Sequence, residues 1–115
     1  MIKLKRVYDP PDETDGCRVL VDRIWPRGLS KADARVDKWL KDIAPTTGLR
    51  KWFGHDPAKW DEFRARYARE LDQHGDAVRE LRALSRGRTV TLLFAAKDSE
   101  HSNAAALKDY LAARR

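Results

Sequence analysis

Residues 88–96 read RTVTLLFAA and form the most apolar stretch of this 115-residue sequence. A run of this length and composition is typical of a central strand buried on both faces. Residues 17–24, CRVLVDRI, are rich in β-branched and aliphatic side chains and predict a second buried strand. Residues 2–8 alternate apolar and polar side chains, which predicts a third, shorter strand.

Helical signals lie between and after these strands. Ser30 followed by Asp33 predicts an N-cap and a helix that begins at Lys31. Thr47 predicts the cap of a short helix that Gly54 closes. Residues 36–43 fit helical spacing, but their branched and aromatic content also suits an extended segment. Both interpretations of 36–43 stay open at this point.

The C-terminal half predicts three helices. Asp56 before Pro57 starts a long one, because an aspartate cap and a proline at the first helical position leave few backbone donors unpaired. Its expected core stripe is Trp60, Phe63, Tyr67 and Leu71. A second helix follows Gly75 and ends at Gly87, and Ser102 or Asn103 caps the last one. Strands mixed with helices predict a small layered α/β domain, with 1–115 as one domain.

Composition narrows the class of protein further. The sequence is 42% hydrophobic, which is too apolar for a disordered chain. The longest apolar run, 90–96, is far shorter than the roughly 20 residues of a membrane span, so we expect no membrane association. No signal-peptide pattern opens the chain, and Cys17 is its one cysteine, which excludes an internal disulfide. A reducing cytoplasm is the expected location.

The charge balance favours an anionic partner without identifying it. Lys and Arg exceed Asp and Glu by 24 to 18, giving a formal net charge of +6. The excess is spread along the chain and forms no basic block, so it fits an ordinary solvated surface as well as a nucleic-acid footprint.

Two polar loops, 22–28 and 97–103, follow the two buried strands directly. If the strands are parallel, both loops open at the same edge of the sheet, where ligands bind in open α/β proteins. We expect the two loops to meet around one site. The candidate ligand-binding residues are Arg23, Trp25, Arg27, Lys97 and Asn103. The candidates for proton transfer are Asp22, Asp98 and His101.

These residue types are suited to anion recognition. Arginine offers a planar fork of donors to phosphate or carboxylate, and lysine adds a point charge. The tryptophan can stack on a ring, and the histidine can act as a general acid or base. The same charges could equally form ordinary surface ion pairs with Asp22 or Asp98.

Other chemistries have little support in the sequence. No cysteine follows the central strand, where a phosphatase-like loop would carry its nucleophile. The three histidines, His55, His74 and His101, lack the spacing that presents two metal ligands together. No glycine-rich nucleotide motif is present. We therefore expect neither a metal nor a cofactor.

Several of these segments together resemble a known family. The sequence is similar to the YeaO-like branch of the bacterial family called domain of unknown function 488 (DUF488), and the resemblance covers nearly the whole chain. It rests on 5–10 (KRVYDP), 15–16 (DG), 19–28 (VLVDRIWPRG), Trp39, 44–45 (AP), 49–51 (LRK) and 92–98 (LLFAAKD).

The resemblance implies a Rossmann-like, mainly parallel sheet flanked by helices, and a site built from the 22–28 and 97–98 loops. It favours a strand over 36–42 after a short helix at 30–34. Longer relatives carry a cysteine and a further histidine in the second loop, where this chain has Ser102 and Asn103. A cysteine-based mechanism is therefore disfavoured. The family has no settled biochemical function.

Three functions remain open. The first is an enzyme that acts at the two loops on a small anionic substrate, such as a molecule derived from a nucleotide. The second is a non-catalytic module that binds nucleic acid or protein through arginines such as Arg64, Arg66 and Arg69. The third is an oligomer that buries exposed tryptophans. The sequence leaves the oligomeric state open.

Overall fold

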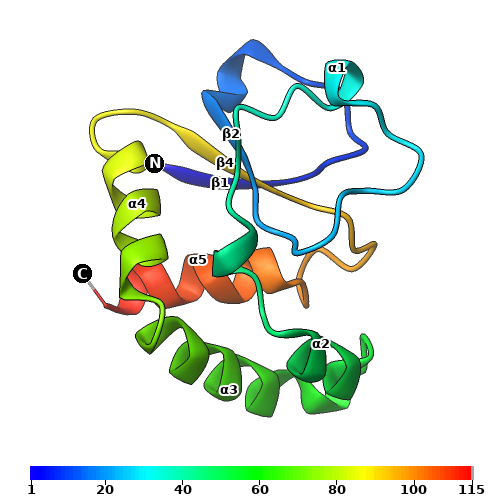
Figure 1. The fold of residues 1–115 in the computed structure, drawn as a ribbon, viewed down its shortest axis with the longest axis vertical. Coiled ribbons are helices and arrows are strands. Elements are labelled where there is room, and N and C mark those ends of the chain that lie inside the picture. Colours follow the sequence, from blue (N-terminus) through cyan, green and yellow to red (C-terminus); the bar gives the residue numbers. More distant parts are fainter. Residues whose placement is uncertain (115) are drawn as a thin grey trace.

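The computed structural model describes residues 1–114 and contains one four-stranded parallel sheet (Figure 1). The order of the strands across the sheet is β1-β4-β2-β3. Their bounds are β1 Ile2–Arg6, β2 Cys17–Leu20, β3 Lys38–Trp39 and β4 Val90–Phe94. The predicted α/β class and mainly parallel sheet are confirmed. Arg115 lies outside the described residues.

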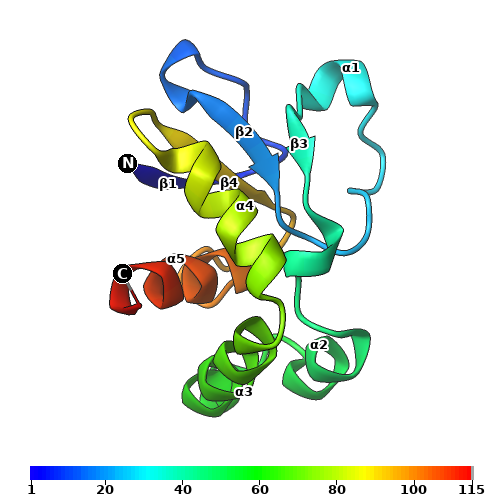
Figure 2. The same cartoon turned by 60° about the vertical axis from the view of Figure 1, so that its left-hand side comes forward.

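Strand β4 occupies an interior position because its side chains are apolar on both faces. It pairs with β1 over five residues and with β2 over four, and all five of its residues are buried. β1 and β2 are therefore parallel without being neighbours, since β4 lies between them. Figure 2 shows β3 beside β2 at the far edge of the sheet.

The side-chain alternation of the strands separates two apolar layers. Val19, Leu92 and Phe94 face a large core that includes residues of the C-terminal helices. Leu20 and Leu93 face a smaller cluster on the opposite side, with Ala34. The helices are α1 Lys31–Ala34, α2 Thr47–Phe53, α3 Trp60–Asp72, α4 Gly75–Ser85 and α5 Asn103–Ala113.

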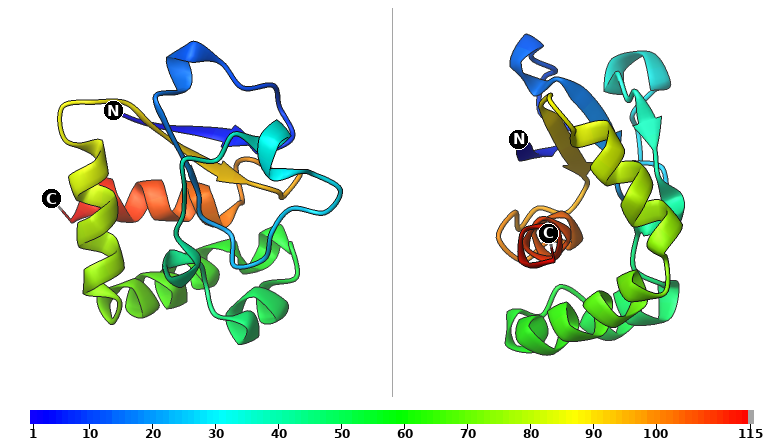
Figure 3. Two further views of the ribbon diagram at one scale, coloured as in Figure 1. Left: turned by 45° about the horizontal axis from the view of Figure 1, so that its top comes forward. Right: turned by 90° about the vertical axis from the view of Figure 1, so that its left-hand side faces the viewer.

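Helix α5 lies between the sheet and α3, as the right-hand view of Figure 3 shows. The predicted inward stripe of α3 is confirmed for Phe63, Tyr67 and Leu71, which are buried, whereas Trp60 is half-buried. The Tyr67 hydroxyl donates a 2.6 Å hydrogen bond to the Ile43 carbonyl. This bond fixes α3 to the segment after β3 and places the neighbouring α2 near the end of the sheet.

Several predicted boundaries need correction. The strand predicted at 17–24 ends at Leu20, and the strand predicted at 88–96 spans Val90–Phe94. The ladder stops because the Ala95 N–H donates to the Asp22 carboxylate, so a side chain replaces the main-chain acceptor. The cap of α2 is Thr46 rather than Thr47, and its hydroxyl accepts from the Leu49 N–H.

The ambiguous segment 36–43 contains both a strand and helical turns. It includes β3, which is only two residues long, and the 3₁₀ helix η2, Lys41–Ile43. The strand favoured over 36–42 is therefore too long, because only Lys38–Trp39 forms a strand. Asp37 explains part of the difference, because its carboxylate accepts from the Arg18 N–H where a longer strand would use its backbone.

Two further 3₁₀ turns complete the chain: η1 Glu13–Asp15 and η3 Pro57–Lys59. Turn η3 is capped by Asp56, with Pro57 at its first position, as predicted, and leads directly into α3. Ser102 caps α5 by accepting from the Ala105 N–H.

Candidate functional site

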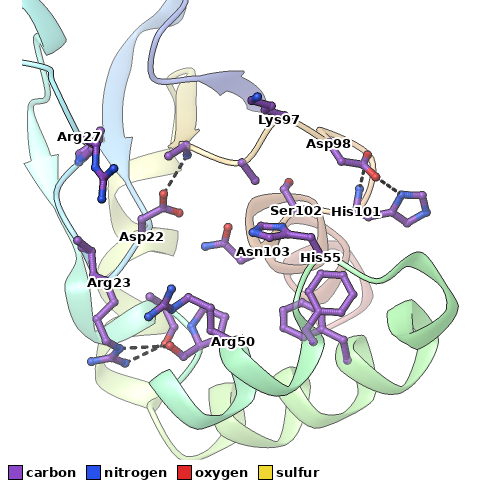
Figure 4. Close-up of a pocket in the computed structure, with 18 of the residues that line it drawn as sticks. Asp22, Arg23, Arg27, Arg50, His55, Lys97, Asp98, His101, Ser102 and Asn103 are labelled. Atoms are coloured by element: carbon purple, nitrogen blue, oxygen red, sulfur yellow. Dashed lines mark hydrogen bonds and ion pairs between the residues drawn. The ribbon is translucent and has the colours of Figure 1, made fainter.

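A cavity of about 680 Å³ lies at the carboxyl ends of the adjacent strands β2 and β4 (Figure 4). The loops that follow these two strands line it together, as the sequence predicts, and Arg27 and Lys97 lie on the same cavity. Helix α2 and the turn after it form the opposite wall. All eight residues predicted for the site are among its lining.

Asp22 is held at the junction of the two loops. Its Oδ2 accepts a 2.9 Å hydrogen bond from the Ala95 N–H, and its main-chain carbonyl accepts one of 2.7 Å from the Trp39 indole. Both contacts come from other segments of the chain, so the position of the carboxylate is set by the fold. Figure 4 shows this carboxylate directed into the cavity.

Burial raises the pKa of Asp22 above its ordinary value of 3.8, because a low-dielectric environment disfavours the charged form. The Ala95 N–H, the Asn103 amide and the charges of Arg50 and His55 act in the opposite direction. Among the described residues that line the cavity, Asp22 alone has a raised pKa, and a raised pKa with access to the cavity is the combination that suits proton transfer.

Asn103 stands next to Asp22 at the start of α5. Its Nδ2 donates a 3.0 Å hydrogen bond to the Val21 carbonyl. A carbonyl can only accept, so this contact fixes which end of the amide faces the strand. The amide oxygen of Asn103 is therefore left facing the cavity as an acceptor.

Three cations surround the cavity without a partner in residues 1–114. The side chains of Arg27, Arg50 and Lys97 make no hydrogen bond or ion pair there, and all three residues are exposed. Arg50 projects from α2 across the cavity toward the sheet (Figure 4). Unpaired guanidinium and ammonium groups around one hollow attract an anion.

Arg23 lines the cavity as predicted, but its guanidinium also bonds to two main-chain carbonyls. Its Nη2 donates to the Ala44 carbonyl at 3.1 Å and its Nε to the Pro45 carbonyl at 3.2 Å. Both carbonyls belong to the segment that leads into α2. The guanidinium therefore ties the loop after β2 to that segment, and this use leaves it fewer donors for a ligand.

Asp98 and His101 bond to each other at the rim of the cavity. The His101 Nδ1 lies 2.8 Å from Asp98 Oδ2, and its ring meets the Trp60 ring edge-on at 5.2 Å between centroids. The hydrogen bond from His101 lowers the pKa of Asp98. Figure 4 shows the pair turned away from Asp22. The three predicted proton-transfer residues therefore do not form one group.

The remaining walls are mainly apolar. Trp25 is half-buried, with its indole N–H donating to the Leu29 carbonyl and its ring against Trp39 at 5.4 Å between centroids. Other apolar lining residues are Ile24, Pro26, Ala44, Pro45, Phe53 and Phe63. Walls of this kind exclude water and suit a ring or other flat apolar part of a ligand.

Arg50 and His55 are among the cavity residues that were not identified from the sequence. Their positions depend on where α2 packs, which local spacing does not reveal. Figure 4 shows the His55 ring directed into the cavity. This residue has a φ of 57°, directly after Gly54 at 54°, and left-handed backbone at a non-glycine residue is a common feature of functional sites.

Within residues 1–114 there is no group of three or more His, Cys, Asp or Glu side chains placed to hold a metal ion. Cys17 is half-buried against the main core, away from the cavity. In the same residues, no helix is long and apolar enough to cross a membrane.

The fold and the site together define a class of protein: a small parallel α/β protein with a cation-rimmed cavity at the carboxyl ends of its strands. The chain belongs to the DUF488 family, since the family model described as "Inactive DUF488-N3 subclade" matches residues 1–115. The resemblance inferred from the sequence is confirmed.

Named relatives agree with this assignment. The chain is 43% identical to Uncharacterized protein YeaO of Escherichia coli (strain K12) over 96% of each chain. It is 45% identical to Uncharacterized protein Rv3073c of Mycobacterium tuberculosis (strain ATCC 25618 / H37Rv), over 98% of this chain and 95% of the relative. No solved structure matches the chain significantly.

Proposed function

We propose that the protein binds a small molecule bearing a phosphate or carboxylate in the cavity at the end of the sheet. The observation that carries the proposal is the set of three cations, Arg27, Arg50 and Lys97, which border the cavity and have no partner in residues 1–114. A planar guanidinium can form two parallel hydrogen bonds to either anion, and the lysine supplies a further charge.

We favour recognition of the ligand over its chemical conversion. The subclade is described as inactive. Asp98 and His101, two of the candidates for proton transfer, are hydrogen-bonded to each other at the rim of the cavity. No cysteine among the described residues lines the cavity. The enzyme hypothesis would have to rest on Asp22 alone as the acid or base.

The nucleic-acid alternative on α3 has weaker support. Arg64 forms an ion pair with Asp109, and Arg66 pairs with Glu62 and lies over the Trp52 ring at 4.4 Å. Existing partners make Arg64 and Arg66 weaker candidates for phosphate contacts, whereas Arg69 has no side-chain partner in residues 1–114. The oligomer alternative also loses its basis, because all four tryptophans are half-buried. The cytoplasm stays the expected location.

Thermal unfolding with added anions tests the proposal. Inorganic phosphate, citrate and ribose 5-phosphate are added separately to the wild-type protein and to Arg50→Gln and Arg27→Gln. A ligand at about ten times its dissociation constant stabilises the folded state by about 1.4 kcal/mol, or roughly 4–8 °C for a domain of this size. We expect such a shift in the wild type and a clear reduction in both variants.

Arg69→Gln is the matched control, because Arg69 is exposed on α3, outside the cavity lining, and makes no side-chain ion pair or hydrogen bond in residues 1–114. It should respond to the anions as the wild type does. Equal shifts in all four proteins would mean that the anions act on the general surface charge. That result would contradict the proposal.

A further inference from the structure

We infer that the anion bound in this cavity also carries N–H donors on a flat ring edge, as a guanine nucleotide does, and that Asp22 and Asn103 accept from them. The inference rests on the proposed function and deepens it. It follows from a division of the cavity wall into an acceptor side and a cation side.

The acceptor side consists of two side-chain oxygens at the edge of the sheet. Asp22 uses Oδ2 for the Ala95 N–H, and its Oδ1, near the Asn103 amide, has no donor within hydrogen-bond distance in residues 1–114. Asn103 uses its nitrogen for the Val21 carbonyl, which leaves its oxygen without a donor in the same residues. No side-chain oxygen of the described chain is both sealed from solvent and unpaired. Both oxygens are therefore open to the cavity, one from the loop after β2 and the other from the start of α5.

The cation side is the wall that α2 forms, while the other two cations, Arg27 and Lys97, belong to the same loops as Asp22 and Asn103. Arg50 projects from α2 and His55 from the turn after it, opposite the sheet edge (Figure 4). A simple anion such as phosphate satisfies this side only and leaves two acceptors facing it, which repel an anion. A ligand that satisfies both sides needs an anionic group at one end and hydrogen-bond donors at the other.

The shape and polarity of the cavity suggest what the donor end is. Apolar side chains such as Trp25, Pro45 and Phe53 form the walls between the two sides, and flat rings pack well against such walls. The volume of about 680 Å³ is much larger than a phosphate needs. Two neighbouring acceptors match two neighbouring N–H donors on one ring edge, which guanine provides at N1 and its 2-amino group.

A neutral N–H edge fits better than an ammonium group. Arg50 is close enough to Asp22 to favour its charged form, so an ammonium group here would place a second full positive charge near the guanidinium. A metal ion also fits poorly, because residues 1–114 place no group of three His, Cys, Asp or Glu ligands here.

Isothermal titration calorimetry with three probes tests the inference: guanosine 5′-monophosphate, xanthosine 5′-monophosphate and ribose 5-phosphate. The wild type should bind guanosine monophosphate at least about tenfold more tightly than ribose 5-phosphate, because unmatched acceptors disfavour the sugar phosphate. In Asp22→Asn the amide replaces one acceptor oxygen with a donor. The preference of this variant for guanosine monophosphate over ribose 5-phosphate should fall about tenfold. Xanthosine monophosphate has a carbonyl where guanine has its 2-amino group, so it should bind the variant more tightly than it binds the wild type.

The outcomes separate the inference from the proposed function. Asp22→Asn removes a negative charge from the cavity and should bind ribose 5-phosphate at least as tightly as the wild type does. A cooperative thermal unfolding transition shows separately that the variant is folded. Equal affinity of the wild type for guanosine monophosphate and ribose 5-phosphate would overturn the inference and leave anion binding intact. Failure of the wild type to bind any of the three phosphates would overturn both.

Discussion

Asp22 Oδ2 accepts a 2.9 Å hydrogen bond from the main-chain N–H of Ala95, so a side chain after β2 completes the bonding of the strand next to it. One oxygen of the carboxylate thus holds the two loops together, and the other faces the cavity. The contact joins the two loops that the sequence places 73 residues apart. The cavity exists because these loops end at the same edge of the sheet.

The raised pKa of Asp22 predicts how stability depends on pH. The folded state holds this proton more strongly than the unfolded chain does, so wild-type stability falls as the pH rises from 3.8 through the folded-state pKa. Asp22→Asn cannot ionise and escapes this loss. Thermal unfolding in phosphate-free buffer should show similar midpoint temperatures for both proteins well below pH 3.8. At neutral pH the midpoint temperature of the variant should be about 2–5 °C higher than that of the wild type. A difference that does not change with pH would show that Asp22 titrates normally.

Asp15 and Arg18 predict a large loss of stability when their pairing is broken. Both are buried, their charged atoms lie 2.5 Å apart, and Lys5 contacts the same carboxylate at 2.8 Å. Asp15→Ala leaves the Arg18 guanidinium buried without its counter-ion, which costs about 3–5 kcal/mol. Chemical denaturation measures this. The control is Lys38→Ala, whose exposed pair with Glu80 should cost less than about 1 kcal/mol. Equal costs for the two variants would exclude a special role for the buried pair.

The Asp15 carboxylate also predicts part of the loss of folding stability at acidic pH. Burial alone would raise the pKa of Asp15, but hydrogen bonds from Lys5, the Asp12 backbone and Arg18 lower it below 3.8. Its contribution to stability is therefore complete above 3.8 and is lost as the pH falls through the folded-state pKa. The stability of Asp15→Ala should accordingly decline less steeply than that of the wild type in this acidic range, as measured by denaturant titrations at successive pH values. Parallel declines would contradict the assignment.

Gly16 and Gly28 predict unequal effects of the same substitution. Both have positive φ, but a Cβ at Gly16 would lie 2.2 Å from the Thr89 carbonyl oxygen, whereas a Cβ at Gly28 meets nothing within 4 Å. Gly28→Ala should cost about 1 kcal/mol from backbone strain alone. Gly16→Ala adds a backbone clash at the start of β2 and should cost at least about 3 kcal/mol. Comparable denaturation midpoints for the two variants would show that the backbone at Gly16 relaxes easily.

Much of the fold could be predicted because its signals are local. The apolar run of β4, the alternation in β1 and the caps at Ser30, Asp56 and Ser102 depend on neighbouring residues only. The strand ends could not be predicted in the same way. They depend on Asp22 and Asp37 taking the place of main-chain acceptors, which requires the tertiary structure.

The location of the site could be predicted better than the set of residues that line it. Polar loops after two buried strands indicate the sheet edge, and the structure confirms that they meet there. Arg23 could not be distinguished from Arg27 by sequence, because its use depends on the Ala44 and Pro45 carbonyls reaching it. Arg50 belongs to a helix that looks like any other short helix until its packing is known. The ligand-binding roles remain predictions.

The most direct test of anion binding in the cavity is an amide ¹H–¹⁵N NMR titration of the wild-type protein with guanosine 5′-monophosphate. We predict saturable shifts concentrated in residues 22–28, 50–55 and 95–103, and little change along the exposed face of α3. Shifts centred on Arg64, Arg66 and Arg69, or none that saturate, would contradict this prediction.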